Sequence, residues 1–337
     1  MSNMDWRRRD IIFGVGAFAA MAAFSHERIS REIALVLAPT NLGLRPNETG
    51  KPPGTWRAPD AYLSEGLRAR LEGGRVVRIA RPAYEFDAQS GTRIRNGKSI
   101  RRFSIELAGI VHKEIGEGRF PLILGGDCSV LLGAMYGARL SGGEGLVHID
   151  GHSDFFHPGN YDTAARLGSV AGMDLALVTG RGEALLTKWP EMEAPLVMDE
   201  DAIQLGERGA LDPDFPKYYG DVVRTRITRL IVQDVLKMGI AKAAQAVIER
   251  LRERKLDRAW LHLDLDVLDQ SVMPAVDSPG SPGLDFAQLG ELLQRLLASN
   301  KFIGADVAIY DPDRDPASTY LGPIVDTLAR AFGGMQR

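Results

Sequence analysis

The sequence has a single cysteine, Cys128, among 337 residues. One cysteine cannot form an intramolecular disulfide, which excludes a disulfide-stabilised scaffold. The roles left for Cys128 are packing, chemical reactivity or metal binding. The chain also lacks an excess of basic charge, because its formal net charge is −3 and its pI is about 6.1. No basic field is present to attract nucleic acid non-specifically, so we expect no nucleic-acid partner.

Long apolar runs are also missing. The longest one near the N-terminus, residues 11–24, is too short to span a bilayer comfortably. It follows a charged segment that includes Arg8 and Arg9, and it contains small residues such as Ala20 and Ala22. This order is typical of a secretory signal, and the arginine pair resembles the twin-arginine type.

We therefore predict a twin-arginine signal segment over residues 1–25 and export to the periplasm. The alternative is an amphipathic N-terminal helix packed on a cytoplasmic protein. An uncleaved N-terminal segment would be the chain's only contact with a membrane. With 45% hydrophobic and 25% charged residues, the remainder has the composition of a globular protein, and no linker divides it. We expect one domain over residues 30–337.

Short apolar strand patterns alternate with helical patterns along this domain. This alternation predicts an α/β fold with three αβα layers and a mostly parallel, doubly wound sheet. Strands are expected at 33–37, 76–79, 120–124, 145–149, 195–198, 202–205, 229–232, 259–263 and 302–309. Helices are expected at 59–71, 99–115, 130–140, 241–254, 286–297 and 322–332.

Carboxylates follow two of the predicted strands directly. Asp150, His152 and Asp154 alternate after one strand, and Asp264 and Asp266 alternate at the end of another. Alternate residues of an extended segment point the same way. Parallel sheets bind ligands beyond the carboxyl ends of their strands, where Cys128 also lies. Gathered in a dry cleft, these carboxylates would repel one another unless a cation were bound. The alternative is that they cap loops and solvated turns.

These motifs resemble the ureohydrolase family of arginases, agmatinases and formiminoglutamases. The family's G-G-D-H-S, D-A-H-x-D and D-x-D-x-x-D-P patterns correspond to residues 125–129, 150–154 and 264–270, with Cys128 in place of histidine and Gln270 in place of proline. The resemblance extends from about Ile33 to the C-terminus. It implies a small-molecule substrate and, in many relatives, a homotrimer or homohexamer.

The resemblance also implies two bound divalent ions, manganese above all. They would activate a water molecule for attack on a planar carbon, hydrolysing a C–N bond of a guanidino or amidino group. Asp154 would be both a ligand and the catalytic residue that hydrogen-bonds the attacking oxygen. The implied ligands are Cys128, Asp150, His152, Asp154, Asp264 and Asp266.

Three departures from the family pattern concern the substrate and the metal. Cys128 is a softer ligand than histidine, which would favour zinc, iron, cobalt or nickel over manganese, unless it is only a small buried residue. Ile309 occupies the position of the glutamate that pairs with a guanidinium, and Asp311 on the same strand face could substitute if the backbone shifts. The proton-shuttling histidine is missing from residues 164–173.

We therefore expect a substrate with a neutral or weakly basic group. The cysteine and the missing histidine resemble the hydroxyarginine hydrolase of the superfamily, which makes a hydroxyguanidine hydrolase one alternative. Others are a catalytically impaired metal- or ligand-binding member of the fold and a single-metal deacetylase on a related fold. His112, His148 and His262 are expected to be satisfied histidines outside the site. Weaker candidates for substrate contact are Phe155, Phe156, His157, Asp277 and Arg181.

Overall fold

The structure is a computed structural model that describes residues 31–46 and 48–335. Its centre is one eight-stranded sheet in the order β2-β1-β3-β8-β7-β4-β5-β6, in which every pair of neighbouring strands is parallel. The predicted parallel sheet is confirmed. The strands are β1 (Ile33–Ala38), β2 (Arg75–Arg78), β3 (Phe120–Gly125), β4 (Gly145–Ile149), β5 (Ala202–Leu205), β6 (Thr228–Leu230), β7 (Ala259–Asp264) and β8 (Phe302–Ala308).

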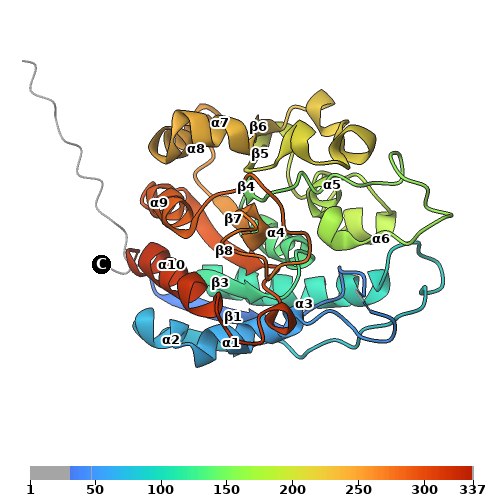
Figure 1. Cartoon of the computed structure of the whole chain (residues 1–337), viewed down its shortest axis with the longest axis horizontal. Coiled ribbons are helices and arrows are strands. Elements are labelled where there is room, and N and C mark those ends of the chain that lie inside the picture. Colours follow the sequence, from blue (N-terminus) through green and yellow to red (C-terminus); the bar gives the residue numbers. More distant parts are fainter. Residues whose placement is uncertain (1–30, 47, 336–337) are drawn as a thin grey trace, which may run out of the picture.

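Helices cover both faces of the sheet, which confirms the three-layer αβα architecture (Figure 1). One face is covered by a row of helices in which each contacts the next, in the order α2, α1, α10, α9, α8 and α7. On the other face, α3 contacts α4 and α6, and α4 also contacts α5. The helices are α1 (Ala58–Ser64), α2 (Leu67–Arg70), α3 (Gly97–Gly116), α4 (Val130–Leu140), α5 (Asp174–Val178), α6 (Ala184–Thr187), α7 (Val232–Met238), α8 (Ile240–Glu253), α9 (Phe286–Leu297) and α10 (Leu321–Gly333).

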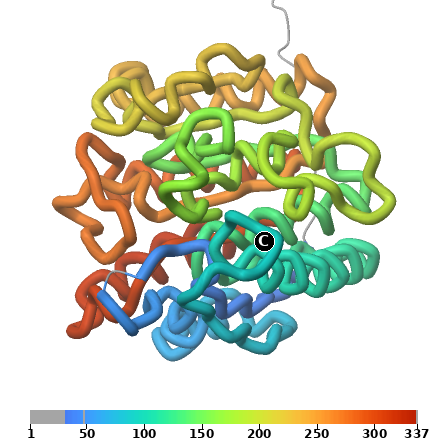
Figure 2. The backbone as a smooth tube through the Cα atoms, turned by 90° about the vertical axis from the view of Figure 1, so that its right-hand side faces the viewer, coloured from blue at the N-terminus to red at the C-terminus, as the bar shows by residue number. Residues whose placement is uncertain are grey.

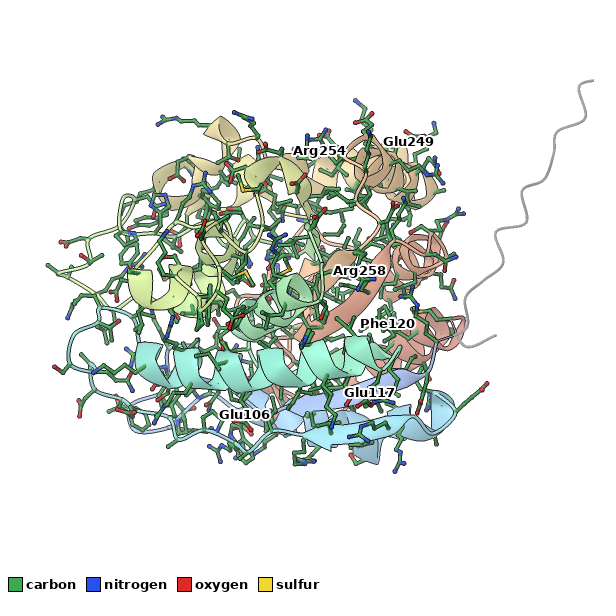
Figure 3. The ribbon with its side chains drawn as sticks, turned by 180° about the vertical axis from the view of Figure 1, so that it is seen from behind. Glu106, Glu117, Phe120, Glu249, Arg254 and Arg258 are labelled. Atoms are coloured by element: carbon green, nitrogen blue, oxygen red, sulfur yellow. The ribbon has the colours of Figure 1, made fainter. Side chains whose placement is uncertain are left out.

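Burial on both faces explains why the central strands read as continuous apolar runs. Every residue of β1, β3, β4, β7 and β8 is buried. Figure 3 shows α3 crossing the back of the molecule, where the labelled Glu117 follows the helix and Phe120 begins β3. Inside this otherwise apolar layer, His148 of β4 pairs in register with His262 of β7, and His262 pairs with Asp306 of β8. Polar side chains therefore lie side by side in the centre of the sheet.

Three expectations about secondary structure were wrong in detail. The helix expected at 59–71 is divided into α1 and α2 at Gly66, whose φ of 88° is left-handed. Residues 195–198 form no strand in the described chain: Leu196 and Val197 are buried and Met198 is exposed, and Val197 donates its N–H to Val178 O at the end of α5. The strand expected at 229–232 ends at Leu230, because Val232 already begins α7.

One glycine of the first motif is required by close packing. A Cβ atom on Gly126 would lie 1.7 Å from the carbonyl oxygen of Thr40, which is backbone and cannot rotate away. We expect Gly126→Ala to lower the free energy of unfolding by about 3 kcal/mol or more. Gly109→Ala, at an open position of α3, should instead raise it by roughly 0.5–1 kcal/mol. Chemical denaturation of both variants checks this, and equal effects would contradict it.

Among the residues that the structure describes, no helix is long and apolar enough to cross a membrane. The signal segment expected at residues 1–25 lies outside these residues.

Candidate metal centre

Four neighbouring central strands bring the motif residues together. In the sheet these strands lie in the order β3-β8-β7-β4, and their carboxyl ends meet on one edge. Cys128 follows β3, Ile309 follows β8, Asp264 ends β7, and residues 150–154 follow β4. Figure 2 shows the side on which the loops after β1 (blue), β4 (green) and β7 (orange) lie close to one another. The six residues predicted as ligands thus come from three strand ends at one place.

One part of the cluster joins the first and third motifs. The sulfur of Cys128 donates a hydrogen bond to Asp264 Oδ2 at 2.7 Å, although 136 residues separate the two in sequence. Asp264 accepts a second hydrogen bond through Oδ1, from the backbone N–H of Asp266 at 2.6 Å. Both side chains are buried. Cys128 therefore faces the predicted ligand set and is not simply a packed apolar residue.

The other part joins the second and third motifs. His152 Nδ1 lies 2.8 Å from Asp266 Oδ2 and 3.7 Å from Asp150 Oδ1. Ligand atoms of these three residues all lie within 4.8 Å of one another, a spacing compatible with one shared cation. Asp154 belongs to a further group of this spacing, with His148 and Asp174. All six predicted ligands thus converge on one region.

A cavity of about 610 Å³ opens onto this region. His152, Asp154, Asp264 and Asp266 reach its wall, whereas Cys128 and Asp150 lie behind them and do not line it. Its volume is in the range that accommodates a small organic molecule. Other lining residues include Arg45, Phe156, Arg166, Ala171, Asp212, Asp214, Tyr219, Asp277 and Ile309.

The carboxylates carry more negative charge than the protein alone compensates. Burial and the neighbouring Asp266 and Asp150 raise the pKa of Asp264 well above its ordinary value, and burial and Asp150 do the same for Asp154. Burial disfavours the charged form of His152, but Asp266 and Asp150 together outweigh it and raise the pKa of His152 well above its ordinary value. A dication would remove this repulsion.

Buried polar atoms without partners test whether a metal fits. Asp150 Oδ2, Asp174 Oδ2 and His262 Nε2 have no hydrogen-bond partner among the described residues, although their side chains are fully buried. Such atoms are costly in a folded protein unless an ion or water binds them. Carboxylate oxygens, imidazole nitrogens and one sulfur are all donors to divalent metals. The residues present therefore fit a metal centre.

His148 and His262 were expected to be satisfied core histidines, and this was wrong in part. Both are fully buried, and their rings stack with centroids 4.7 Å apart. However, His148 Nδ1 and His262 Nε2 have no partner in the described chain, and both rings contact Asp174. Each histidine lies two residues before a motif aspartate, so strand alternation could have placed it on the ligand face. Asp174 was missed entirely; its only signal was an isolated carboxylate in the apolar run 173–178.

The residues expected to determine the substrate do not all line the cavity. Ile309 lines the cavity as expected, with a left-handed φ of 78° that is strained for a β-branched residue. Asp311 does not substitute for an acid there, because it turns away from the cavity and accepts hydrogen bonds from the N–H groups of Gly54 and Asp313. Ala171 contributes to the wall in the segment that lacks a histidine.

The weaker candidates divide in the same way. Phe156 and Asp277 line the cavity, whereas Phe155 is packed in the core. His157 Nε2 lies 2.5 Å from Asp221 Oδ2, and Arg181 pairs with Asp199 through both terminal nitrogens. Phe156 and Asp277 are therefore the two that can reach a substrate.

Arg208 connects the loops that carry the predicted ligands, although no sequence pattern pointed to it. Its buried guanidinium donates to Gly151 O at 3.0 Å and to Asp266 O at 2.6 Å. We expect Arg208→Met to lower metal affinity by about 10–100-fold, as loss of a group that orients ligands does. The exposed Arg226→Met should leave it unchanged. Isothermal titration with Mn²⁺ compares the two, and equal affinities would contradict this connecting role.

The comparisons with known proteins agree with this geometry. The sequence model of the arginase family matches residues 31–325 of this chain. The arginase of Bacillus caldovelox is 28% identical over 252 residues, covering 74% of this chain and 81% of its own. That of Staphylococcus aureus strain MSSA476 is 27% identical over 314 residues, covering 90% and 98%.

Solved structures show the same fold. The structure of Bacillus caldovelox arginase superposes with a TM-score of 0.76 at 25% identity, covering 90% of this chain and 98% of that one. Proclavaminate amidino hydrolase from Streptomyces clavuligerus shares the fold at 18% identity, with a TM-score of 0.60 and 91% and 93% coverage. With the family match spanning most of its length and candidate metal-binding groups at the expected strand ends, the chain belongs to the arginase family of hydrolases.

Proposed function

We propose that this protein is a metal-dependent hydrolase that cleaves a C–N bond of a small guanidino- or amidino-type compound whose reacting group is neutral or weakly basic. The observation that carries the proposal is the cavity wall, where four predicted ligands and Ile309 meet. Ile309 offers no charge to a guanidinium, and Asp311 is outside the cavity. A less basic group would not require such a partner.

Two divalent ions would supply the Lewis acidity that lets water react near neutral pH. They would be held by Cys128, Asp150, His152, Asp154, Asp264 and Asp266. Manganese is the metal that the family resemblance implies, and the sulfur of Cys128 makes zinc, iron, cobalt or nickel competitive.

We assign the transfer of the proton to Asp154. It reaches the cavity wall, and its left-handed backbone, with φ of 43°, presents the carboxylate beside the other acids. Its carboxylate lies beside the other predicted ligands, so it can accept a proton from the attacking water and pass it to the leaving nitrogen. This would provide a proton route in a site whose 164–173 segment contains no histidine.

A substrate panel tests the proposal. Urea or amine release would be measured with arginine, hydroxyarginine, agmatine, guanidino acids and formimino compounds. We expect the weakly basic compounds, hydroxyarginine among them, to be turned over and arginine to be poor. Fast turnover of arginine would contradict the substrate class, and no turnover of any compound by metal-loaded protein would favour the catalytically impaired alternative. Acetate release from acetylated lysine or polyamines would favour the deacetylase.

We also propose, from the N-terminal sequence, that the protein is exported to the periplasm by the twin-arginine route. Fractionation of cells carrying the full chain and an Arg8→Lys, Arg9→Lys variant tests this. Loss of periplasmic protein in the variant alone is the expected result. Equal distribution of both in the cytoplasm would contradict it. Chromatography with light scattering would decide between a monomer and the trimer or hexamer expected from the resemblance.

A further inference from the structure

A second group of side chains with the spacing of metal ligands lies behind the wall of the cavity. Cys128, Asp174 and His262 offer a sulfur, an oxygen and a nitrogen that all lie within 4.8 Å of one another. All three are buried, and none of them lines the cavity. Asp174 and His262 belong to none of the three sequence motifs that supply the predicted ligands. This group of three residues is called the deep cluster below.

The atoms of the deep cluster that face one another have no other partners. His262 Nε2 and Asp174 Oδ2 lie 3.6 Å apart, and neither has a hydrogen-bond partner in the described part of the chain. Ligands of a tetrahedral zinc ion, with metal–ligand bonds of about 2.0–2.3 Å, are separated by roughly 3.3–3.8 Å. The spacing of this pair therefore suits a bound zinc ion without large rearrangement.

Outer hydrogen bonds orient both side chains toward that point. His262 Nδ1 donates to Asp306 Oδ2 at 2.5 Å, and Trp260 Nε1 fixes the other oxygen of Asp306 at 2.6 Å. A carboxylate on one imidazole nitrogen is the usual support for metal ligation by the other. On the opposite side, His148 Nε2 donates to Asp174 Oδ1 at 3.2 Å, which leaves Asp174 Oδ2 directed at His262.

We propose that Asp174 and His262 are metal ligands that, with Cys128 and Asp264, form an enclosed zinc-type shell for the deeper ion of the proposed pair. Asp264 joins the shell because its Oδ2 accepts a hydrogen bond from the thiol of Cys128 at 2.7 Å, and zinc binding would replace the proton that this bond contains. The inference rests on the proposed two-ion centre and refines it. A closed shell of four protein ligands is typical of a structural ion, whereas a catalytic ion keeps an open position.

The catalytic and structural roles of the two proposed ions follow from their access to the cavity. The other ion, near Asp150, His152 and Asp266, lies where two of these ligands reach the cavity wall. It would therefore be the ion that contacts water and substrate, while the deep ion holds the three strand ends together. We expect the deep site to select zinc because it combines thiolate, imidazole and carboxylate.

A buried imidazolium is the competing explanation for the same contacts. A protonated His262 between Asp174 and Asp306 would also satisfy their charges, and it would need no metal. Zinc content at saturating Zn²⁺ separates the two explanations, because substitution of a ligand removes one ion, whereas substitution of a residue that only forms ion pairs leaves the ligand set complete.

The experiment loads full-length protein with Zn²⁺ alone and measures zinc per chain for the wild type, Asp174→Asn and His262→Gln. We expect about two ions in the wild type and about one in each variant. Asp315→Asn is the matched control for a buried aspartate, since Asp315 bonds Tyr310 and Thr319 away from the cluster. His112→Gln is the control for a histidine away from the cluster, since His112 is exposed on α3 and its Nδ1 contacts Ser141. Both controls should keep about two ions.

X-ray absorption at the zinc edge of the wild-type protein provides a second measurement that needs no variant to fold. A sulfur ligand together with about two imidazole ligands per chain, as expected from His152 and His262, supports the inference. About one imidazole ligand per chain, as expected from His152 alone, overturns it. Full zinc retention by both variants also overturns it while leaving the proposed function intact. A wild type that binds no metal would overturn both.

Discussion

Asp264→Asn should reduce C–N bond hydrolysis by more than about 100-fold, because loss of groups that merely orient metal ligands already costs about 10–100-fold. Asparagine keeps the size of the side chain and one oxygen for the N–H of Asp266. It removes the negative charge from the position where Cys128, Asp266 and the cavity meet. The predicted loss is therefore one of metal binding and of the activated water, measured as kcat/KM on the best substrate of the panel.

The matched control lies near the other end of the same strand. Asp257, two residues before β7, is exposed and pairs with Lys301 on the surface. Asp257→Asn should leave kcat/KM within about twofold, since exposed ion pairs contribute little. If Asp264→Asn kept more than a tenth of the wild-type activity with normal metal content, Asp264 would not be a ligand of the catalytic centre.

Removing the metal should destabilise the protein, and more so as the pH rises. Two ions, each present at about 100 times its dissociation constant, would together contribute roughly 5 kcal/mol. At roughly 2 °C per kcal/mol for a chain of this size, the melting temperature should fall by about 10 °C on chelation at neutral pH. Differential scanning fluorimetry with and without excess Zn²⁺ or Mn²⁺ measures this shift.

The direction of the pH dependence follows from the buried acids of the metal-free protein. Burial, together with neighbouring aspartates, raises the pKa of Asp154, Asp174 and Asp264 well above the ordinary value near 4. Their contribution to stability is therefore complete below about pH 4 and is lost as the pH rises toward these elevated values. Asp266, whose pKa is lowered by His152 despite its burial, acts oppositely and only below about pH 4.

The metal-free protein should accordingly be less stable at pH 8 than at pH 5.5, and the metal-loaded protein should lose this difference. If the metal-free protein were equally stable at pH 8 and pH 5.5, the buried carboxylates would not repel one another as predicted. Asp257→Asn serves again as the reference, because it should leave both curves unchanged.

The sheet could be predicted from the sequence because its central strands are apolar on both faces. β3, β4, β7 and β8 begin where expected, and the helices α4 and α9 match their predicted bounds. The motif aspartates could also be placed, since they follow strands that must end on one edge of a parallel sheet. The spatial order β3-β8-β7-β4, which makes them neighbours, came from the structure alone.

What the sequence did not reveal are contacts between segments far apart in the chain. Asp174 begins a short helix after a long loop, and no spacing rule connects it with His262, 88 residues later. Arg208 likewise reaches two motif loops from beyond β5. The sequence pattern placed Asp311 on the same strand face as Ile309. However, the strand ends at Ala308, and the left-handed backbone of Ile309 itself interrupts the alternation, so the two side chains do not face the same cavity.

Metal stoichiometry tests the central claim most directly. Protein purified full length would be stripped, dialysed against Mn²⁺ or Zn²⁺ at neutral pH and examined by elemental analysis and anomalous diffraction. The account predicts about two ions per chain, with anomalous peaks between the six side chains Cys128, Asp150, His152, Asp154, Asp264 and Asp266. Absence of bound metal, or peaks away from these side chains, would contradict it.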